Sequence, residues 1–149
     1  MTGLTFIVMQ KTPNQPEPRG NTVQINVFVD ADHAGNRLTR RSHTGILIYL
    51  NSAPIIWYSK AQSMVETSTF GSEFVAMKTA VEMFDALCYK LRMFGIPIDG
   101  ATNVFCNNQS FVTNSTIPDS TLHRKHNAIA YNRVRESVAS NVIRIAYVH

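Results

Sequence analysis

The chain has few cysteines and no long apolar run. Its two cysteines, Cys88 and Cys106, show no CxxC or Cys/His spacing, which argues against both a disulfide framework and a zinc site and favours a reducing compartment. No apolar run approaches the ~20 residues that a membrane span needs. Residues 1–9 lack the positive start and small-residue cleavage site of a secretory signal. We therefore expect an intracellular protein, in the cytoplasm or nucleus, with no membrane partner.

Charge is also scarce, and acids are scarcer than bases. Only 16% of the residues are charged, and 14 Lys and Arg stand against 10 Asp and Glu. The basic residues cluster in two regions of the sequence, which favours a polyanionic partner. The charge pattern by itself is equally consistent with two ordinary surface faces in contact with water. The candidate nucleic-acid-binding residues in these regions are Arg40, Arg41, Lys60, Arg124 and Lys125.

The length and apolar content are sufficient for one core. With 149 residues, 44% of them hydrophobic, the chain can bury one core and is too short for two. Three of its six prolines fall within residues 13–18, a pattern typical of an extended linker. We therefore expect a leader over residues 1–21 and a single domain over residues 22–149.

The first half of that domain has the patterns of three strands and a long helix. Residues 23–30 have Val or Ile at every second position, on one face, and residues 45–50 and 54–58 are rich in β-forming side chains around a short turn. Apolar residues then recur every three or four positions over 70–94, which predicts an amphipathic helix. Ser68 or Thr69 can cap its start, and Gly95 ends it.

The second half continues with alternating elements. It predicts a strand over residues 102–106, a brief helix over 107–114, a helix over 122–138 and a final strand over 142–148. The order β-β-β-α-β-α-α-β predicts an α/β fold with a mixed sheet covered by helices. We also expect Tyr49, Trp57 and Phe105, which lie within strand patterns, to belong to the core rather than to a base-stacking surface.

Three polar residues lie at the ends of predicted elements. Asp30 ends the first strand, Glu73 lies in the first turn of the long helix, and Asn107 follows the fourth strand. If strands one and four are neighbours under the helix, the three side chains meet within about 8 Å, as in nucleases that hold two Mg²⁺ ions about 4 Å apart. Alternatively, Glu73 is only an acid favoured by the helix dipole and Asp30 only a strand-end residue.

Five short sequence motifs occur in order along the domain. They are DADHAG at 30–35, RSHTG at 41–45, WYSKAQ at 57–62, STFGSEF at 68–74 and CNNQS at 106–110. This ordered set resembles the motifs of copia-type retrotransposon ribonuclease H, part of a reverse transcriptase polyprotein. The resemblance covers about residues 22–148, and Lys125-His126 adds a weaker match.

The resemblance implies a ribonuclease-H-like mixed five-stranded sheet and Mg²⁺-dependent cleavage of RNA in RNA/DNA hybrids. It places the first catalytic acid at Asp30 and the second at Glu73, both as metal ligands, and the third at Asn107, where the family has Asp. A fourth acid, on a helix after the last strand, falls beyond His149, so we expect a C-terminally truncated domain without its final helix. An amide lacks the negative charge that holds a hard cation, so we expect weak or absent Mg²⁺ binding.

Other residues could replace the missing acid less well. Asp32, two positions beyond Asp30, is the nearest candidate, and His33 and His149 are further ones. We expect no such rescue, because an Asp after a strand commonly caps the backbone amides of a turn.

Three hypotheses for function follow. The first is an active ribonuclease H. The second is a non-catalytic descendant that binds nucleic acid or serves as a structural or protein-interaction subunit. The third is an engineered fragment in which Asn107 replaces Asp to trap substrate. We favour ribonuclease H ancestry with impaired catalysis, a pseudoenzyme. Without its final helix, the sheet should expose apolar surface near residues 142–148, unless a protein partner or residues 4–9 cover it.

Overall fold

The computed structural model describes residues 16–66, 68–116 and 128–149. Most of the predicted leader therefore lies outside the described residues, and so do Arg124 and Lys125. No described helix is long and apolar enough to cross a membrane.

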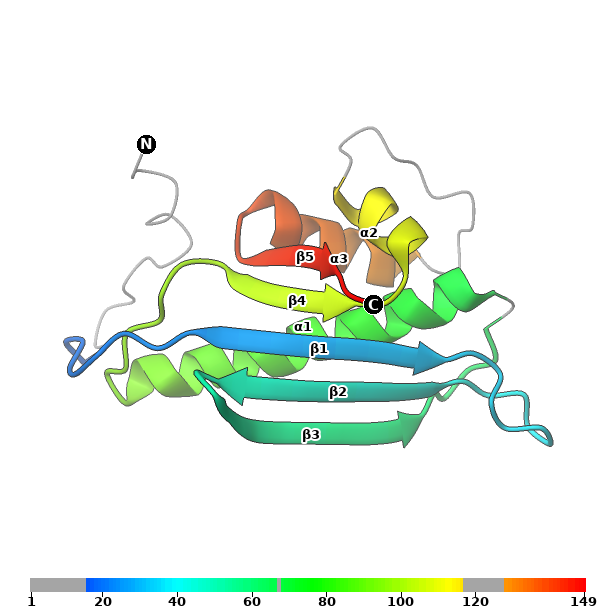
Figure 1. Cartoon of the computed structure of the whole chain (residues 1–149), viewed down its shortest axis with the longest axis horizontal. Coiled ribbons are helices and arrows are strands. Elements are labelled where there is room, and N and C mark those ends of the chain that lie inside the picture. The colour runs from blue at the N-terminus through cyan, green and yellow to red at the C-terminus, as the bar shows by residue number, and fades with distance from the viewer. Residues whose placement is uncertain (1–15, 67, 117–127) are drawn as a thin grey trace.

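The described residues form one five-stranded sheet in the order β3-β2-β1-β4-β5 (Figure 1). β1, β2 and β3 are an antiparallel meander, whereas β4 runs parallel to β1 and β5 runs parallel to β4. The predicted mixed sheet is confirmed. The strands are β1 (Ile25–Asp32), β2 (His43–Leu50), β3 (Ala53–Ala61), β4 (Thr102–Cys106) and β5 (Ile143–Tyr147).

Alternation along β1 separates the two faces of the sheet. Val27 and Val29 are buried, whereas Phe28 and Asp30 between and beside them lie on the exposed face. β2 and β3 are longer than predicted, because their backbones continue to pair as far as His43 and Ala61 although the side chains there are polar or small. Backbone pairing needs no apolar side chain, so the apolar pattern marks only the middle of these strands.

In the described parts of the chain three helices accompany the sheet: α1 (Thr69–Met93), α2 (Gln109–Thr116) and α3 (Ala128–Ala139). The Ser68 side chain caps α1 by accepting a hydrogen bond from the Gly71 amide, and Gly95 adopts the left-handed φ of +74° just after the helix ends. α2 begins two residues later than predicted. The first six residues of the last predicted helix, from Leu122, lie outside the described residues.

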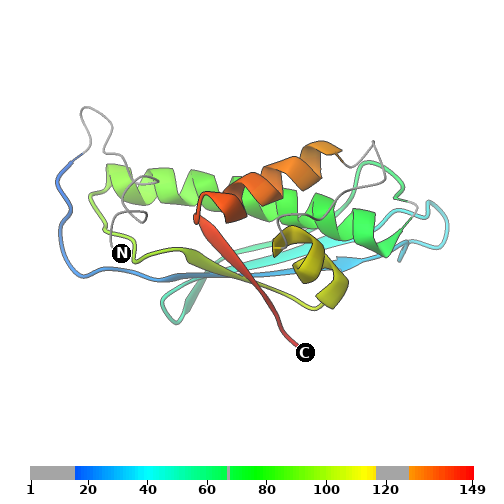
Figure 2. The same cartoon turned by 90° about the horizontal axis from the view of Figure 1, so that it is seen from above.

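The core lies between the sheet and the helices. α1 and α3 pack together on one face of the sheet, as Figure 2 shows from above. Phe74 of α1 and Phe111 of α2 are fully buried with ring centroids 4.4 Å apart, and Ile48 and Val134 are also fully buried. Among the described residues no helix covers the opposite face, which carries Asp30 at one end.

Candidate functional site

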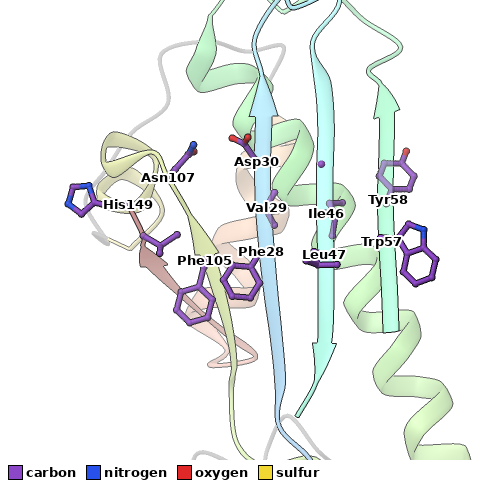
Figure 3. A pocket seen from close by; sticks show the side chains of 12 residues that line it. Phe28, Val29, Asp30, Ile46, Leu47, Trp57, Tyr58, Phe105, Asn107 and His149 are labelled. Atoms are coloured by element: carbon purple, nitrogen blue, oxygen red, sulfur yellow. The ribbon is translucent and has the colours of Figure 1, made fainter. Parts of the chain in front are cut away.

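Two of the three predicted site residues lie side by side at the end of the parallel strands. Val29 of β1 pairs with Cys106 of β4, so Asp30 and Asn107 directly follow a paired position on neighbouring strands. Both side chains line a pocket of about 480 Å³ on the exposed face (Figure 3). Asp30 and Asn107 therefore lie at the same end of two neighbouring strands, as the sequence predicted.

Glu73 approaches the same end of the sheet from the helical side. Its side chain is buried, with 4% of its surface exposed, in the first turns of α1. Burial raises the pKa of Glu73 to about 7, and the negative charge of Asp30 adds to the rise. Because that charge acts on Glu73, the helix carboxylate and the strand carboxylate belong to one electrostatic site.

The oxygen donors at this site suit a hard divalent cation such as Mg²⁺. Two carboxylates that repel each other and one amide oxygen offer ligands for a single ion, which commonly keeps several waters. The same set does not suit a pair of ions, because the third position is neutral. No three acid, His or Cys side chains in the described parts of the chain form a metal-binding group.

The three residues that could replace the missing acid as a metal ligand lie in different environments. Asp32 lies on the same face of β1 as Asp30, but its carboxylate packs so closely on Gly35 that a side chain at that glycine would clash with it. His33 lies near the Ser42 hydroxyl and does not line the pocket. His149 lines the pocket together with Asp30 and Asn107, and its Nδ1 lies 3.2 Å from the Tyr147 hydroxyl.

Three of the five predicted basic residues lie at the end of the sheet that carries Asp30. Arg40 and Arg41 are exposed in the loop between β1 and β2, where the Arg40 amide donates to the Asn36 carbonyl and Arg40 has a φ of +57°. Lys60 is exposed on β3 and pairs with Thr44 of β2. Arg40 and Arg41 thus bring positive charge to this end of the sheet. Lys60 is in register with the buried Thr44 and Ala31, so it lies on the face of the sheet opposite to Asp30.

An apolar row crosses the exposed face, and sequence reasoning missed it. Trp57 pairs with Leu47, Leu47 pairs with Phe28, and Phe28 pairs with Phe105, so four side chains line up across four strands. The Phe28 and Phe105 rings stack with centroids 5.0 Å apart (Figure 3). The prediction that Trp57 belongs to the core is wrong: 77% of its surface is exposed. The alternation of β1, which places Phe28 opposite Val27 and Val29, was the available signal.

The flank beside this row also exposes apolar surface. Tyr147 and Val148, at the end of β5, are each 39% exposed. The predicted apolar exposure near residues 142–148 is therefore present in the described part of the chain.

Several known proteins that resemble the chain in sequence are retrotransposon polyproteins. No family model matches it. It is 29% identical over 130 residues to the "Retrovirus-related Pol polyprotein from transposon RE1" of Arabidopsis thaliana, a match that covers 87% of the chain and 9% of the polyprotein. The chain thus spans about a tenth of such relatives. It is also 36% identical over 79 residues to the "Secreted RxLR effector protein 161" of Plasmopara viticola, covering 53% of the chain and 56% of the effector.

Several solved structures with the same fold are ribonucleases H. The structure of RNase H1 from the archaeon Halobacterium salinarum matches with a TM-score of 0.61 and 13% identity, over 84% of this chain and 85% of that one. LC11-RNase H1 in complex with an RNA/DNA hybrid matches with a TM-score of 0.61 and 17% identity, over 85% and 84%. The chain therefore has the ribonuclease H fold, and its sequence is similar to a segment of retrotransposon polyproteins, which supports its resemblance to the ribonuclease-H-like domain of the copia type.

Proposed function

We propose that the chain descends from a metal-dependent ribonuclease H and still binds RNA/DNA hybrids, but cuts their RNA strand poorly. The observation that carries this proposal is that Asp30 lies within electrostatic reach of Glu73 and lines one pocket with Asn107, the third position of the site. The solved relative LC11-RNase H1 was captured with an RNA/DNA hybrid, which supports the substrate class.

In this proposal Asp30 and Glu73 hold one Mg²⁺ weakly. Mg²⁺ bound there would neutralise the two carboxylates and polarise a phosphate oxygen. In-line cleavage by the two-ion route also needs charge stabilisation at the leaving oxygen, and the neutral Asn107 amide gives a second ion no anionic ligand. We therefore expect the chain to cut RNA much more slowly than a ribonuclease H with Asp at this position, although its fold is intact.

The neutral residue at position 107 should weaken the binding of RNA/DNA hybrids less than it slows their cleavage. Removing a negative charge beside a phosphate eases repulsion, while basic side chains still neutralise the nucleic-acid backbone. We assign this role to Arg40 and Arg41 at the Asp30 end of the sheet, and also to Arg124 and Lys125, which lie outside the described residues.

The basic loop is tested by binding measurements at several salt concentrations. Replacing Arg40 and Arg41 by Ala should weaken hybrid binding about tenfold and reduce the slope of log affinity against log salt by about 2, because each phosphate contact contributes about one to that slope. The matched control replaces Arg92 of α1 and Arg144 of β5, which lie towards the other end of the sheet, by Ala. An equal loss in the control would show that only net charge matters.

A protein-interaction role is the second candidate, and two observations favour it. In the apolar row Phe28 and Trp57 are exposed, Leu47 and Phe105 are half-buried, and no described helix covers them. One relative is named as a secreted effector and not as a polyprotein.

The exposed row should make the chain self-associate. At tens of micromolar we expect sedimentation to show dimers or larger species and a fluorescent apolar dye to bind, because contiguous apolar patches are usually covered. Replacing both Leu47 and Trp57 by Ser should return the chain to a monomer. A monomeric, non-aggregating chain that nevertheless binds the dye would contradict this expectation.

A further inference from the structure

A cluster of buried polar side chains lies between the strands and the start of α1. Its members are exposed by 5% or less, although burying a polar group is costly unless it is hydrogen-bonded. The cluster comprises Ser42, Thr44, Gln62, Ser72 and Glu73. Gln62, at the end of the WYSKAQ motif, is the member that joins the others.

The Gln62 side chain links two elements through its amide nitrogen. Its Nε2 donates to the Thr44 hydroxyl of β2 at 3.1 Å and to the Ser72 carbonyl of α1 at 2.9 Å, both buried. The Gln62 backbone amide donates to the Ser42 carbonyl at 2.8 Å. One residue just beyond β3 thus joins the sheet to the first turn of the long helix.

Both acceptors of this amide group adjoin the acids of the site. Ser72 directly precedes Glu73, and Thr44 pairs with Ala31, which directly follows Asp30. The path from Glu73 through Ser72 and Gln62 to Thr44 therefore consists of covalent and hydrogen bonds, and Thr44 lies opposite Ala31 in the ladder between β2 and β1.

The Gln62 oxygen argues against a purely stabilising role. Oε1 is buried and has no hydrogen-bond partner among the described residues. A buried unpaired oxygen destabilises the folded state, whereas an apolar side chain of the same shape would avoid that cost. The two donor bonds that the amide makes are what an apolar residue could not supply.

We propose that Gln62 is a positioning residue, which holds the first turn of α1 against β2 and so sets the spacing of Glu73 and Asp30. Its effect on metal binding rests on the function proposed above. Its effect on the helix start does not, so the two claims can fail separately.

Hydrogen exchange tests the structural half of the proposal. Gln62→Met keeps the length of the side chain and removes its donor, so amides of residues 72–76 should exchange at least about tenfold faster through local opening. Residues 80–91 of the same helix should change only by the global loss of stability. Val134→Ala, a cavity in the fully buried core of α3, supplies a variant that is destabilised without any change at the site.

Mn²⁺ binding, followed by electron paramagnetic resonance, tests the site. Removing a residue that orients a metal ligand commonly costs 10–100-fold in affinity, so we expect Gln62→Met to bind Mn²⁺ at least tenfold more weakly, with Val134→Ala unchanged. Thr44→Val, which removes one acceptor and keeps the shape, should lie between them and serves if Gln62→Met does not fold.

Each outcome decides one claim. Unchanged local exchange in Gln62→Met or Thr44→Val would overturn the positioning role. Faster local exchange with unaltered Mn²⁺ affinity would overturn its link to the site. If the unchanged chain binds no Mn²⁺, the weak single-ion site of the function proposed above fails, and hydrogen exchange still tests the positioning role of Gln62.

Discussion

Asn107→Asp is expected to raise the rate at which the chain cuts RNA in a labelled RNA/DNA hybrid by at least about 100-fold, or about 3 kcal/mol at the transition state. Asn107 lies beside Asp30 in the pocket, and an acid there would give three anionic ligands. That set can hold a second ion, which stabilises the leaving oxygen. The rate is measured in Mg²⁺ and again in Mn²⁺.

The neighbouring residue provides the matched control. Asn108 caps α2 by accepting from the Phe111 amide at 2.9 Å, and Asp caps helices as well as Asn does. Asn108→Asp therefore makes the same chemical change one position along and should bring no gain in rate. Asp30→Asn added to Asn107→Asp should abolish the gain. Equal rates for the two single Asp variants would contradict our assignment of position 107.

A fourth acid should raise the rate further. The resemblance places it on a helix after the last strand. Extending the Asn107→Asp variant by the segment that follows this region in the polyprotein relatives should therefore give a faster enzyme than Asn107→Asp alone, because another carboxylate strengthens binding of both ions. Activity that appears only in this extended variant still supports impairment of the unchanged chain.

Glu73→Gln is expected to remove a large pH dependence of stability. Burial and the charge of Asp30 raise the Glu73 pKa from 4.5 to about 7, so the folded state holds a proton that the unfolded state releases more readily. The stability is therefore fully present below pH 4.5 and is lost as the pH rises through about 7. Between pH 4.5 and pH 8 the free energy of unfolding should fall by roughly 2 to 3 kcal/mol, whereas Glu73→Gln should stay nearly flat.

Urea unfolding at several pH values measures this difference. Glu82→Gln is the control, because Glu82 lies in the same helix as an exposed partner of Lys78 and its loss should leave the pH dependence in place. Mg²⁺ or Mn²⁺ at pH 8 should restore part of the stability of the unchanged chain, because a cation neutralises the two carboxylates. An equally steep fall in Glu73→Gln would show that other groups cause it.

Local patterns were enough to predict the elements and the fold. The alternation around Val27 marks β1, and the spacing of Phe74, Val81 and Phe84 marks α1, because each period follows from backbone geometry. The ends of β2 and β3 were missed because backbone pairing there does not depend on apolar side chains.

The exposure of side chains on the face of the sheet that no described helix covers was harder to predict. Trp57 has a strand pattern, but the pattern says nothing about what covers each face of a sheet, so its exposure could not be read from the sequence. Gln62 was visible only as part of a motif, because its partners Thr44 and Ser72 are 18 and 10 residues away.

The site was partly predictable for a simple geometric reason. Asp30 and Asn107 follow strands that are parallel neighbours, so their positions follow from topology. The burial of Glu73 and its raised pKa depend instead on how α1 packs across the sheet. The sequence therefore predicts which residues lie at the same end of the sheet better than it predicts the pKa values of their side chains.

The most direct test of impaired catalysis is a single assay of the unchanged chain on a labelled RNA/DNA hybrid with Mg²⁺ or Mn²⁺, with binding and cleavage followed together. We predict salt-sensitive binding with little cutting of the RNA strand, because Arg40 and Arg41 remain while Asn107 leaves the carboxylate set incomplete. Robust cutting by the unchanged chain, abolished by Asp30→Asn, would contradict the account and establish an active ribonuclease H.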